Sequence, residues 1–355
     1  MAPPLASDDL NLILEKTRHL WAEMRGKRIF IAGGTGFFGC WLLESFVHAN
    51  RALGLGAQAT VLTRDPEAFV RKCPHLAFDP EIALLEGDIR DFPSPDGDFD
   101  YVIHAVTETA AKRTADNSIA LLTTMVRGTE RLLEFAAGHG TRKLLLASSG
   151  AVYGKQPPGM THIPEDFAGG PNPLDCASTY AEGKRAAEHI CTVLGTKYGI
   201  ECKIARCFAF VGPHLPLDAH FAIGNFIRDA MSGKAIEISG DGTAVRSYLY
   251  AADLAIWLWT ILFQAPALEA FNVGSPQAIG ILDLAHAVAE ALGSHAGVSV
   301  AQQAIPGTHP SRYVPCTKRA EQSLGLRCEV SLQDAIRRTA AWHQLRVAQT
   351  PPPAK

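Results

Sequence analysis

From residue 27 onward, short apolar runs alternate with longer stretches whose apolar positions recur every three or four residues. The short runs are typical of strands, and the stretches near 38–50, 118–138 and 176–198 are typical of helices. The six expected strands are Arg28–Ala32, Ala59–Thr63, Ile82–Glu86, Tyr101–Ala105, Lys143–Ala147 and Glu201–Ala205. Apolar strands that alternate with helices predict an α/β fold built on a doubly wound parallel sheet.

The segments on either side of this alternation have different patterns. Residues 8–25 carry apolar side chains at helical spacing after Ser7 or Asp8, each a suitable N-cap, and predict an amphipathic helix. That helix can pack against the sheet, contact a second copy or act as a lid, and the sequence leaves these roles open. Beyond about Gly212, frequent proline, glycine and histidine predict short helices and strands.

Composition narrows the classes of function. With 355 residues, 47% of them hydrophobic, the chain exceeds one ordinary domain. Its net charge of −3 argues against nucleic acid as a partner and favours a small molecule. No apolar run reaches the ~18 residues of a membrane span, and no secretory signal is expected at the N-terminus. Eight cysteines without C-x-x-C spacing predict reduced thiols, a cytoplasmic protein and no metal site.

A glycine-rich loop follows the first expected strand and precedes a helical pattern. Gly33 can take backbone angles closed to other residues, Gly36 lets the main chain approach a pyrophosphate, and Gly39 lets the helix pack close to the strand. The free N–H groups at the start of the helix then face the anion. The loop predicts a phosphate site for a dinucleotide, made of Gly33, Thr35, Gly36, Phe37, Phe38 and Gly39.

A second motif lies far downstream, where Tyr180 and Lys184 stand four residues apart in a helical segment. Two further motifs fall in a fixed order around it: Ser148-Ser149 before Ala151-Val152-Tyr153-Gly154, and Gly240-Asp241-Gly242 before Arg246. Together with the glycine loop, these residues resemble the extended branch of the short-chain dehydrogenase/reductase family, over about residues 27–343. The resemblance implies an NAD(P)-dependent enzyme that acts on nucleotide-diphosphate sugars, with a Rossmann-type sheet and a smaller C-terminal α/β domain for the substrate.

The resemblance also implies how the chain divides and assembles. The expected parts are an N-terminal extension (1–26), an NAD(P)-binding domain (27–212) with returning segments near 248–273, and an interleaved substrate domain (213–345). Family members pair the helices that correspond to 118–138 and 176–198 with those of a second copy. A homodimer is therefore expected.

The end of the second strand bears on the choice between NAD and NADP. An acidic side chain there hydrogen-bonds the ribose 2′-hydroxyl of NAD, whereas this chain has Thr63 followed by Arg64. Because a guanidinium grips a phosphate with two hydrogen bonds, the pair favours NADP(H). NAD remains the alternative if Arg64 is an ordinary loop residue and Asp65 contacts the ribose.

The resemblance assigns further cofactor residues and the reacting groups. Asp88 and Ile89 would bracket the adenine, and the stretch His104, Ala105 and Val106 would lie beneath the cofactor. The resemblance makes Tyr180 the acid/base, whose hydroxyl would give or take the substrate's proton. The positive charge of Lys184, one helical turn away, would lower the pKa of the Tyr180 phenol from its usual value near 10. Lys184 would also bond the nicotinamide ribose. Ser149 would aim the substrate oxygen at Tyr180, with Ser148 as the alternative register.

Departures from the family pattern bear on the reaction. Hexose 4,6-dehydratases and glucuronate decarboxylases carry acidic residues directly after that serine or threonine, whereas this chain has Gly150-Ala151. Glu108 resembles a dehydratase residue and is expected to contact the sugar or to cap a helix. The expected activity is hydride transfer at carbon 4, as a 4-keto reductase or an epimerase. A 4,6-dehydratase and a catalytically silent NADP-binding regulator are the alternatives.

Three residues are expected to hold the substrate. Arg246 and Arg312 match arginines that reach the diphosphate in the family, and Asn225 is the third, with a helix cap as its ordinary alternative. Ala209 stands where the family usually has asparagine, which weakens the analogy for the phosphate geometry.

Overall fold

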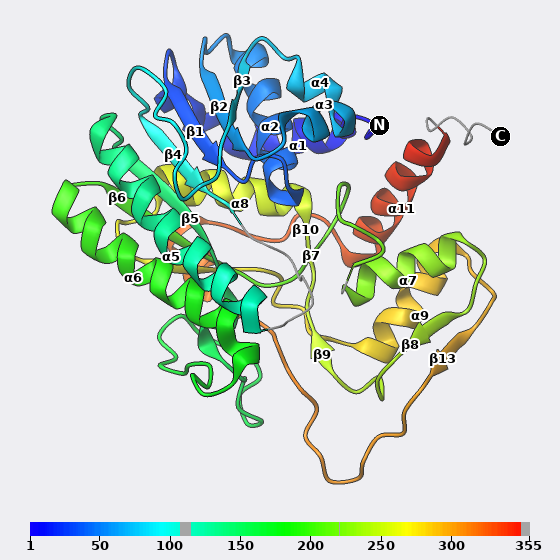
Figure 1. Cartoon of the computed structure of the whole chain (residues 1–355). Helices are drawn as coiled ribbons and strands as arrows, with labels where there is room; N and C mark the ends of the chain where they lie inside the picture. The colour runs from blue at the N-terminus through cyan, green and yellow to red at the C-terminus, as the bar shows by residue number, and fades with distance from the viewer. Residues whose placement is uncertain (107–114, 220, 349–355) are drawn as a thin grey trace.

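The computed structural model describes residues 1–106, 115–219 and 221–348 (Figure 1). Its centre is a seven-stranded sheet in the order β11-β6-β5-β4-β1-β2-β3, in which all neighbours are parallel. The strands are β1 (Arg28–Ala32), β2 (Gln58–Thr63), β3 (Ile82–Glu86), β4 (Tyr101–His104), β5 (Lys143–Ser149), β6 (Glu201–Cys207) and β11 (Ala270–Val273). The predicted α/β fold and all six strands are confirmed, and β11 comes from the returning segment. The order reverses between β1 and β4, where such sheets bind their ligands.

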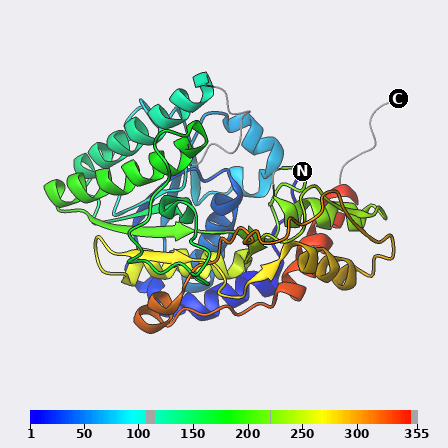
Figure 2. The same cartoon turned by 90° about the horizontal axis from the view of Figure 1, so that it is seen from below.

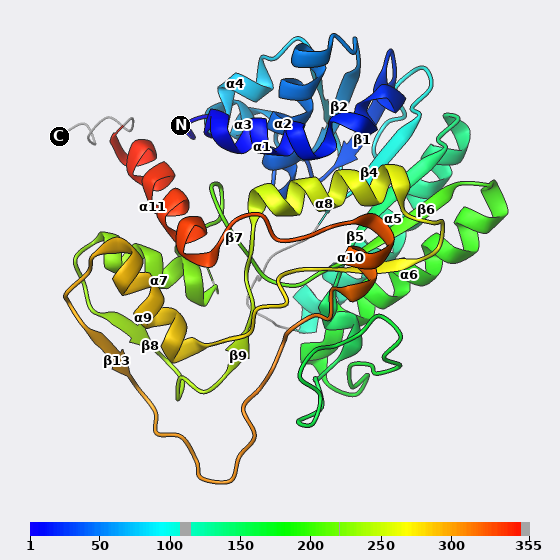
Figure 3. The ribbon, with the colours of Figure 1, turned by 180° about the vertical axis from the view of Figure 1, so that it is seen from behind.

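Successive side chains of the central strands point alternately into two hydrophobic cores, one on each face of the sheet. Ile29 and Ile31 of β1 belong to the larger apolar cluster, whereas Phe30 and Ala32 belong to the other. This split follows from the two-residue period of a strand. Helices α5 (Ala115–Gly138) and α6 (Thr179–Tyr198) cover one face of the sheet, and α2 (Phe37–Leu53) and α8 (Ala251–Gln264) cover the other (Figures 1 and 3).

The N-terminal segment adds a layer over α8 (Figure 3). It forms α1 (Ser7–Thr17) and then a 3-10 helix, η1 (Arg18–Met24), rather than one helix over 8–25. The predicted caps are wrong, because the helix begins one residue earlier and the cap position is held by Ala6, which has no side-chain acceptor. Asp9 is buried, and it accepts a hydrogen bond of 2.7 Å from the hydroxyl of Tyr250, the residue that directly precedes α8. The segment therefore packs mainly against α8 and α2, the helices that cover this face of the sheet, and its expected roles as a dimer contact or a lid stay predictions.

The remaining elements surround the carboxyl ends of the strands or lie beyond them. Helices α7 (Ala222–Met231) and α9 (Ile281–Leu292) lie with β8 (Ile236–Ile238) and β13 (Val298–Val300) well away from the large sheet (Figures 1 and 2). Two further strand pairs are β7 (Phe210–Val211) with β10 (Leu249–Tyr250), and β9 (Val245–Arg246) with β12 (Ile279–Gly280). The short helices are α3 (Pro66–Lys72), α4 (Pro74–Ala77), η2 (Gly150–Tyr153), η3 (Cys176–Ser178) and α10 (Lys318–Leu324), and α11 (Leu332–Ala348) ends the described chain. The domain boundaries at 27 and 213 stay a prediction.

Within the described residues, no helix has the length and apolar character that a membrane span requires.

Candidate active site

The glycine loop joins β1 to α2 directly at the point where the strand order reverses. Gly33 has a φ of +89°, and a Cβ there would lie 2.5 Å from the carbonyl carbon of Ala105 at the end of β4. A Cβ on Gly39 would lie 2.2 Å from the carbonyl carbon of Gly34. A side chain at either position would therefore push the loop off β4 or lift α2 from the loop. Gly36 is the N-cap of α2, so the first N–H groups of this helix open toward the loop.

A cleft of about 330 Å³ opens above this loop. Its walls come from the loops after β1, β2, β3 and β4 and from α3 and α5: Gly33, Thr35, Gly36, Leu62, Thr63, Arg64, Asp65, Ala68, Phe69, Lys72, Gly87, Asp88, Ile89, Ala105, Val106 and Thr124. Nine of the residues predicted to bind the cofactor are among them. Phe37 and Phe38 are not; the Phe38 ring instead packs against Phe210, 5.1 Å between ring centres.

The acidic residues of the cleft already have partners. Asp65 caps α3, and its Oδ1 accepts a hydrogen bond of 2.8 Å from the backbone N–H of Ala68. Asp88 pairs with Arg90, whose Nε lies 2.7 Å from Asp88 Oδ1, and this hydrogen bond lowers the pKa of the Asp88 carboxyl. Arg64 lines the same cleft beside them. The capping role of Asp65 reduces its capacity to accept hydrogen bonds from a ribose.

His104 is a buried, hydrogen-bonded residue at the end of its strand. Its Nε2 lies 3.0 Å from Thr129 Oγ1, and burial lowers the pKa of the ring to about 3. The ring is therefore neutral near pH 7. Its contact with Thr129 fixes the end of β4, directly before Ala105 and Val106.

Lys184 reaches from α6 to the ends of two strands. Its side chain is 2% exposed, and Nζ donates hydrogen bonds to the carbonyl oxygens of Ala147 (2.8 Å) and Val106 (3.4 Å). Burial lowers the pKa of Lys184 to about 8. Tyr180 lies one turn earlier on the same helix, with its ring centre 5.9 Å from Lys184 Nζ. The ammonium group is thus fixed beneath the phenol.

The two serines at the end of β5 point to opposite sides. Ser148 is buried and donates a hydrogen bond of 2.5 Å to Glu188 Oε1. Ser149 lies on the other side, where its hydroxyl accepts a hydrogen bond from the backbone N–H of Ala151 (3.1 Å) and lies close enough to the Tyr313 hydroxyl to lower that phenol's pKa. This alternation favours Ser149 over Ser148 as the serine that faces a substrate.

Tyr313 is a site residue that sequence reasoning missed. Its hydroxyl contacts Ser149 and lies 3.5 Å from the carbonyl oxygen of Cys207, and burial raises the pKa of this phenol. Tyr180 is close enough to affect the same pKa electrostatically. The sequence contains one signal for Tyr313, since it directly follows Arg312, which was predicted to bind the diphosphate. The site therefore holds a second phenol, Tyr313, near both Ser149 and Tyr180.

An aromatic ring occupies the space beside Gly150. A Cβ on Gly150 would lie 2.6 Å from Cζ of Phe208, and the Phe208 ring packs against Tyr313 with 4.6 Å between ring centres. Any larger residue at position 150 therefore requires Phe208 to move. Position 150 thus lacks an acidic side chain, and the Phe208 ring occupies the space that such a side chain would need.

The predicted substrate residues do not all come together. Arg246 on β9 donates a hydrogen bond of 3.0 Å to the carbonyl oxygen of Ser311. The backbone of Arg312 forms a β-bridge with Val245 of the same strand. Arg312 Nε is buried and has no hydrogen-bond partner in the described part of the chain. Asn225 lies inside α7, where its Oδ1 accepts from Arg228 (3.1 Å), so it is not a helix cap. Glu108 lies outside the described residues.

A sequence model described as the NAD dependent epimerase/dehydratase family matches residues 29–274. The chain belongs to this family. Its resemblance to the extended short-chain dehydrogenases/reductases is therefore confirmed, and with it an NAD-dependent enzyme family that acts on nucleotide sugars.

Relatives within the family have different named activities. UDP-glucuronic acid decarboxylase 1 of Xenopus tropicalis is 28% identical over 90% of this chain and 72% of its own. UDP-glucuronic acid decarboxylase 5 of Arabidopsis thaliana is 27% identical over 87% of both chains. Among solved structures, the dTDP-glucose 4,6-dehydratase DesIV of Streptomyces venezuelae, with NAD bound, superposes with a TM-score of 0.75 at 24% identity, over 90% of this chain and 98% of its own. At that identity it shows the fold alone.

Proposed function

We propose that this family member transfers a hydride between a nicotinamide cofactor and carbon 4 of a nucleotide-diphosphate sugar, as a 4-keto reductase or an epimerase. The observation that supports the proposal is that Lys184, 5.9 Å from the ring centre of Tyr180, hydrogen-bonds the carbonyl oxygens of Ala147 and Val106, of which Val106 lines the cleft above the glycine loop. Phe208 beside Gly150 supports a reaction that needs no further acid at that place.

Each of the three side chains has a distinct task in this chemistry. Tyr180 gives or takes the proton of the sugar hydroxyl as the hydride moves. Lys184, held by the carbonyl groups of Ala147 and Val106, supplies the positive charge that favours the phenolate. Ser149 donates a hydrogen bond to the sugar oxygen and fixes its orientation. The cofactor, when bound along the glycine loop, accepts or donates the hydride.

The preferred cofactor is NADP(H), and the prediction rests on Arg64. We expect Arg64→Ala to weaken NADPH binding about 10- to 100-fold, the worth of a charge-assisted hydrogen bond, while NADH binding changes little. Fluorescence titration of both cofactors against the wild-type chain and the variant measures this. Equal wild-type affinities for the two cofactors, or unchanged NADPH affinity in the variant, would refute the preference. Arg71→Ala, on α3 but outside the cleft lining, is the control for a general loss of positive charge, since Arg71 is exposed and pairs at the surface with Glu67.

The reaction type gives a second prediction. Loss of the 6-hydroxyl needs an acid beside the sugar, and positions 150 and 151 carry glycine and alanine. Incubation with nucleotide hexoses and NAD(P) is therefore expected to yield no product lighter by one water in mass spectrometry. A nucleotide-linked hexuronic acid tests the activity named for the relatives, and a product lighter by carbon dioxide would reassign this chain as a decarboxylase. Because cells generally keep NADP reduced, a 4-keto reductase is favoured over an epimerase.

A homodimer through α5 and α6 is the third prediction. These helices cover one face of the sheet, and they expose large apolar side chains, with Ile119 at 67% and Val193 at 51% exposure. Burying them against a second copy would remove this apolar surface from water. Light scattering at micromolar concentration should give about twice the chain mass of 38.1 kDa, and Val193→Asp should shift the population toward the monomer. A wild-type mass near 38.1 kDa would contradict the dimer.

A further inference from the structure

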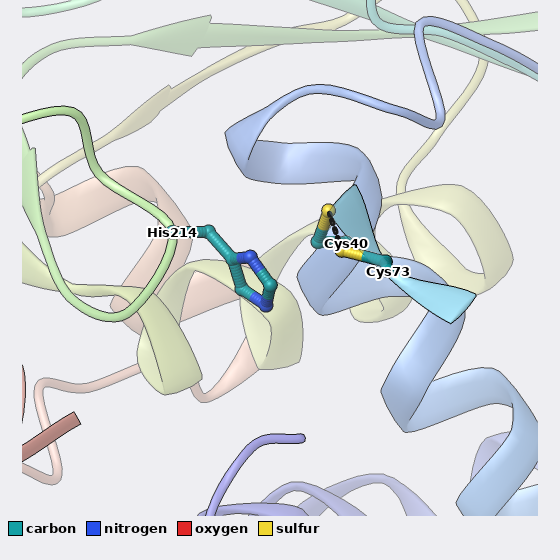
Figure 4. Close-up of side chains that lie close together, drawn as sticks. All are labelled: Cys40, Cys73 and His214. Carbon is teal, nitrogen blue, oxygen red and sulfur yellow. Dashed lines mark hydrogen bonds between the residues drawn. The ribbon is translucent and has the colours of Figure 1, made fainter. Parts of the chain in front are cut away.

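Three buried side chains from distant parts of the chain meet behind the glycine loop (Figure 4). Cys40 lies in the first turns of α2, Cys73 directly follows α3, and His214 belongs to the segment after β7. The two Sγ atoms are 4.0 Å apart, and one ligand atom from each of the three residues lies within 4.8 Å of the others. Among the described residues, this is the one group of three such side chains that comes together.

The histidine presents an unpartnered nitrogen to the two thiols. Its side chain is 0% exposed, and Nδ1 has no hydrogen-bond partner among the described residues. Figure 4 shows this ring turned toward Cys40. The other ring nitrogen, Nε2, lies 3.3 Å from Glu44 Oε1. A proton on Nε2 that is held by this carboxylate leaves the lone pair of Nδ1 free to bind a metal ion.

The distances and charges fit a thiophilic ion. Two sulfurs bound ~2.3 Å from a tetrahedral Zn²⁺ lie about 3.8 Å apart, close to the spacing of Cys40 and Cys73. Two thiolates and one neutral imidazole balance the charge of Zn²⁺, so these ligands and a bound Zn²⁺ together bring no net charge into the interior, whereas the same ligands with Cu⁺ carry one negative charge. Glu44 lies next to the three ligands, and its carboxylate accepts a hydrogen bond from the backbone N–H of Leu5 (2.6 Å) and faces His75 Nε2 (3.2 Å), so groups outside the metal site share its negative charge.

We propose that Cys40, Cys73 and His214 form a binding site for one thiophilic metal ion, Zn²⁺ or Cu⁺. Binding displaces the two thiol protons to solvent, involves no change of oxidation state, and leaves a fourth position for water in the case of Zn²⁺. Sequence reasoning predicted no metal site because it considered ligands close together along the chain, whereas the two cysteines here are 33 residues apart.

The site would tie the cofactor loop to the segment that follows β7. Cys40 Sγ faces the carbonyl oxygen of Thr35 at 3.9 Å, and Lys72 donates a hydrogen bond of 2.7 Å to the same oxygen. His214 has a left-handed backbone, with φ of 69°, which is unusual for a residue other than glycine or asparagine. An ion held here would therefore fix the start of α2 and the conformation of His214 together.

The test begins with the wild-type chain, purified in the reduced state without chelators. Elemental analysis is expected to find about one Zn or Cu per chain, and Co²⁺ added to metal-stripped protein is expected to give a thiolate-to-cobalt absorption band that Zn²⁺ abolishes. Zinc or copper in the analysis tells the two ions apart. If neither ion is found and Co²⁺ gives no such band, the proposal is wrong.

Variants locate the ion. Cys73→Ser and His214→Asn, in which asparagine tolerates the left-handed backbone, are each expected to lower metal content by at least about tenfold. Cys202→Ala is the matched control, because Cys202 is buried beside a second buried cysteine, Cys191, and should keep its metal. Metal retained in both site variants would overturn the proposal. So would a Cys40–Cys73 disulfide in the freshly purified wild type, detected as two missing thiols and a mass lower by two hydrogens.

Discussion

Replacing Tyr180 by phenylalanine is expected to lower kcat by about 10²- to 10⁴-fold, the usual contribution of a positioned acid or base. Cofactor affinity should stay nearly unchanged, because the ring that packs above Lys184 remains and the hydroxyl alone is lost. Single-turnover measurement of NAD(P)H absorbance, together with a separate cofactor titration, distinguishes loss of chemistry from loss of binding.

Tyr313→Phe is the matched control, because this phenol contacts the same serine. Its removal should lower kcat less than about tenfold, the worth of one hydrogen bond. If Tyr313→Phe proves the more damaging substitution, the proton passes through Tyr313 and the proposed role of Tyr180 is wrong. A Tyr180→Phe variant that keeps more than about a hundredth of the wild-type kcat would also show that Tyr180 is not the acid/base.

The central sheet was predictable because its inner strands, such as β1 and β4, are short apolar runs in which both faces are buried. Ile29, Phe30, Ile31 and Ala32 alternate between two cores, so the run contains no polar residue that would obscure it. The cofactor cleft was predictable for a related reason. Its loops follow strand ends in a parallel sheet, and such ends converge on one edge whatever the rest of the chain does.

The parts that sequence did not predict depend on contacts between distant segments. Tyr313 reaches Ser149 because its backbone pairs with β9, where the Tyr313 N–H donates to the carbonyl oxygen of Val245 (3.1 Å). The meeting of Cys40 with His214 likewise depends on where the chain turns after β7. Periodicity within one segment contains no information on either contact.

Phe208 shows how a departure from the family pattern acquires a physical meaning. From sequence, Gly150 is merely the absence of an acid. In the structure, the Phe208 ring would lie 2.6 Å from a Cβ on Gly150, so restoring the acid requires moving a ring that also supports Tyr313. One substitution is therefore insufficient to introduce the dehydratase pattern at this position.

A partly buried ion pair behind the site gives the largest expected effect on stability. Arg206 Nη2 lies 2.7 Å from Glu188 Oε2, and their side chains are 18% and 12% exposed. Ser148 donates a hydrogen bond to the same carboxylate, and Arg206 donates one of 2.9 Å to Tyr153 Oη. Glu188 lies one turn after Lys184 on α6. The pair therefore anchors the catalytic helix to β5 and β6.

Glu188→Gln keeps the shape of this side chain and removes its charge, which leaves the partly buried Arg206 without this counter-ion. We expect the free energy of unfolding to fall by about 2–3 kcal/mol, less than the ~3–5 kcal/mol for a fully buried pair that loses one partner, because both side chains are partly exposed. Urea unfolding followed by circular dichroism measures it. Glu182→Gln is the control on the same helix, since Glu182 lies 3.9 Å from Arg185 at the surface and its loss should cost at most about 1 kcal/mol. Equal losses in the two variants would mean that the Glu188–Arg206 pair does not anchor the helix. Partial recovery when Glu188→Gln is combined with Arg206→Met would identify the unpaired guanidinium as the cause.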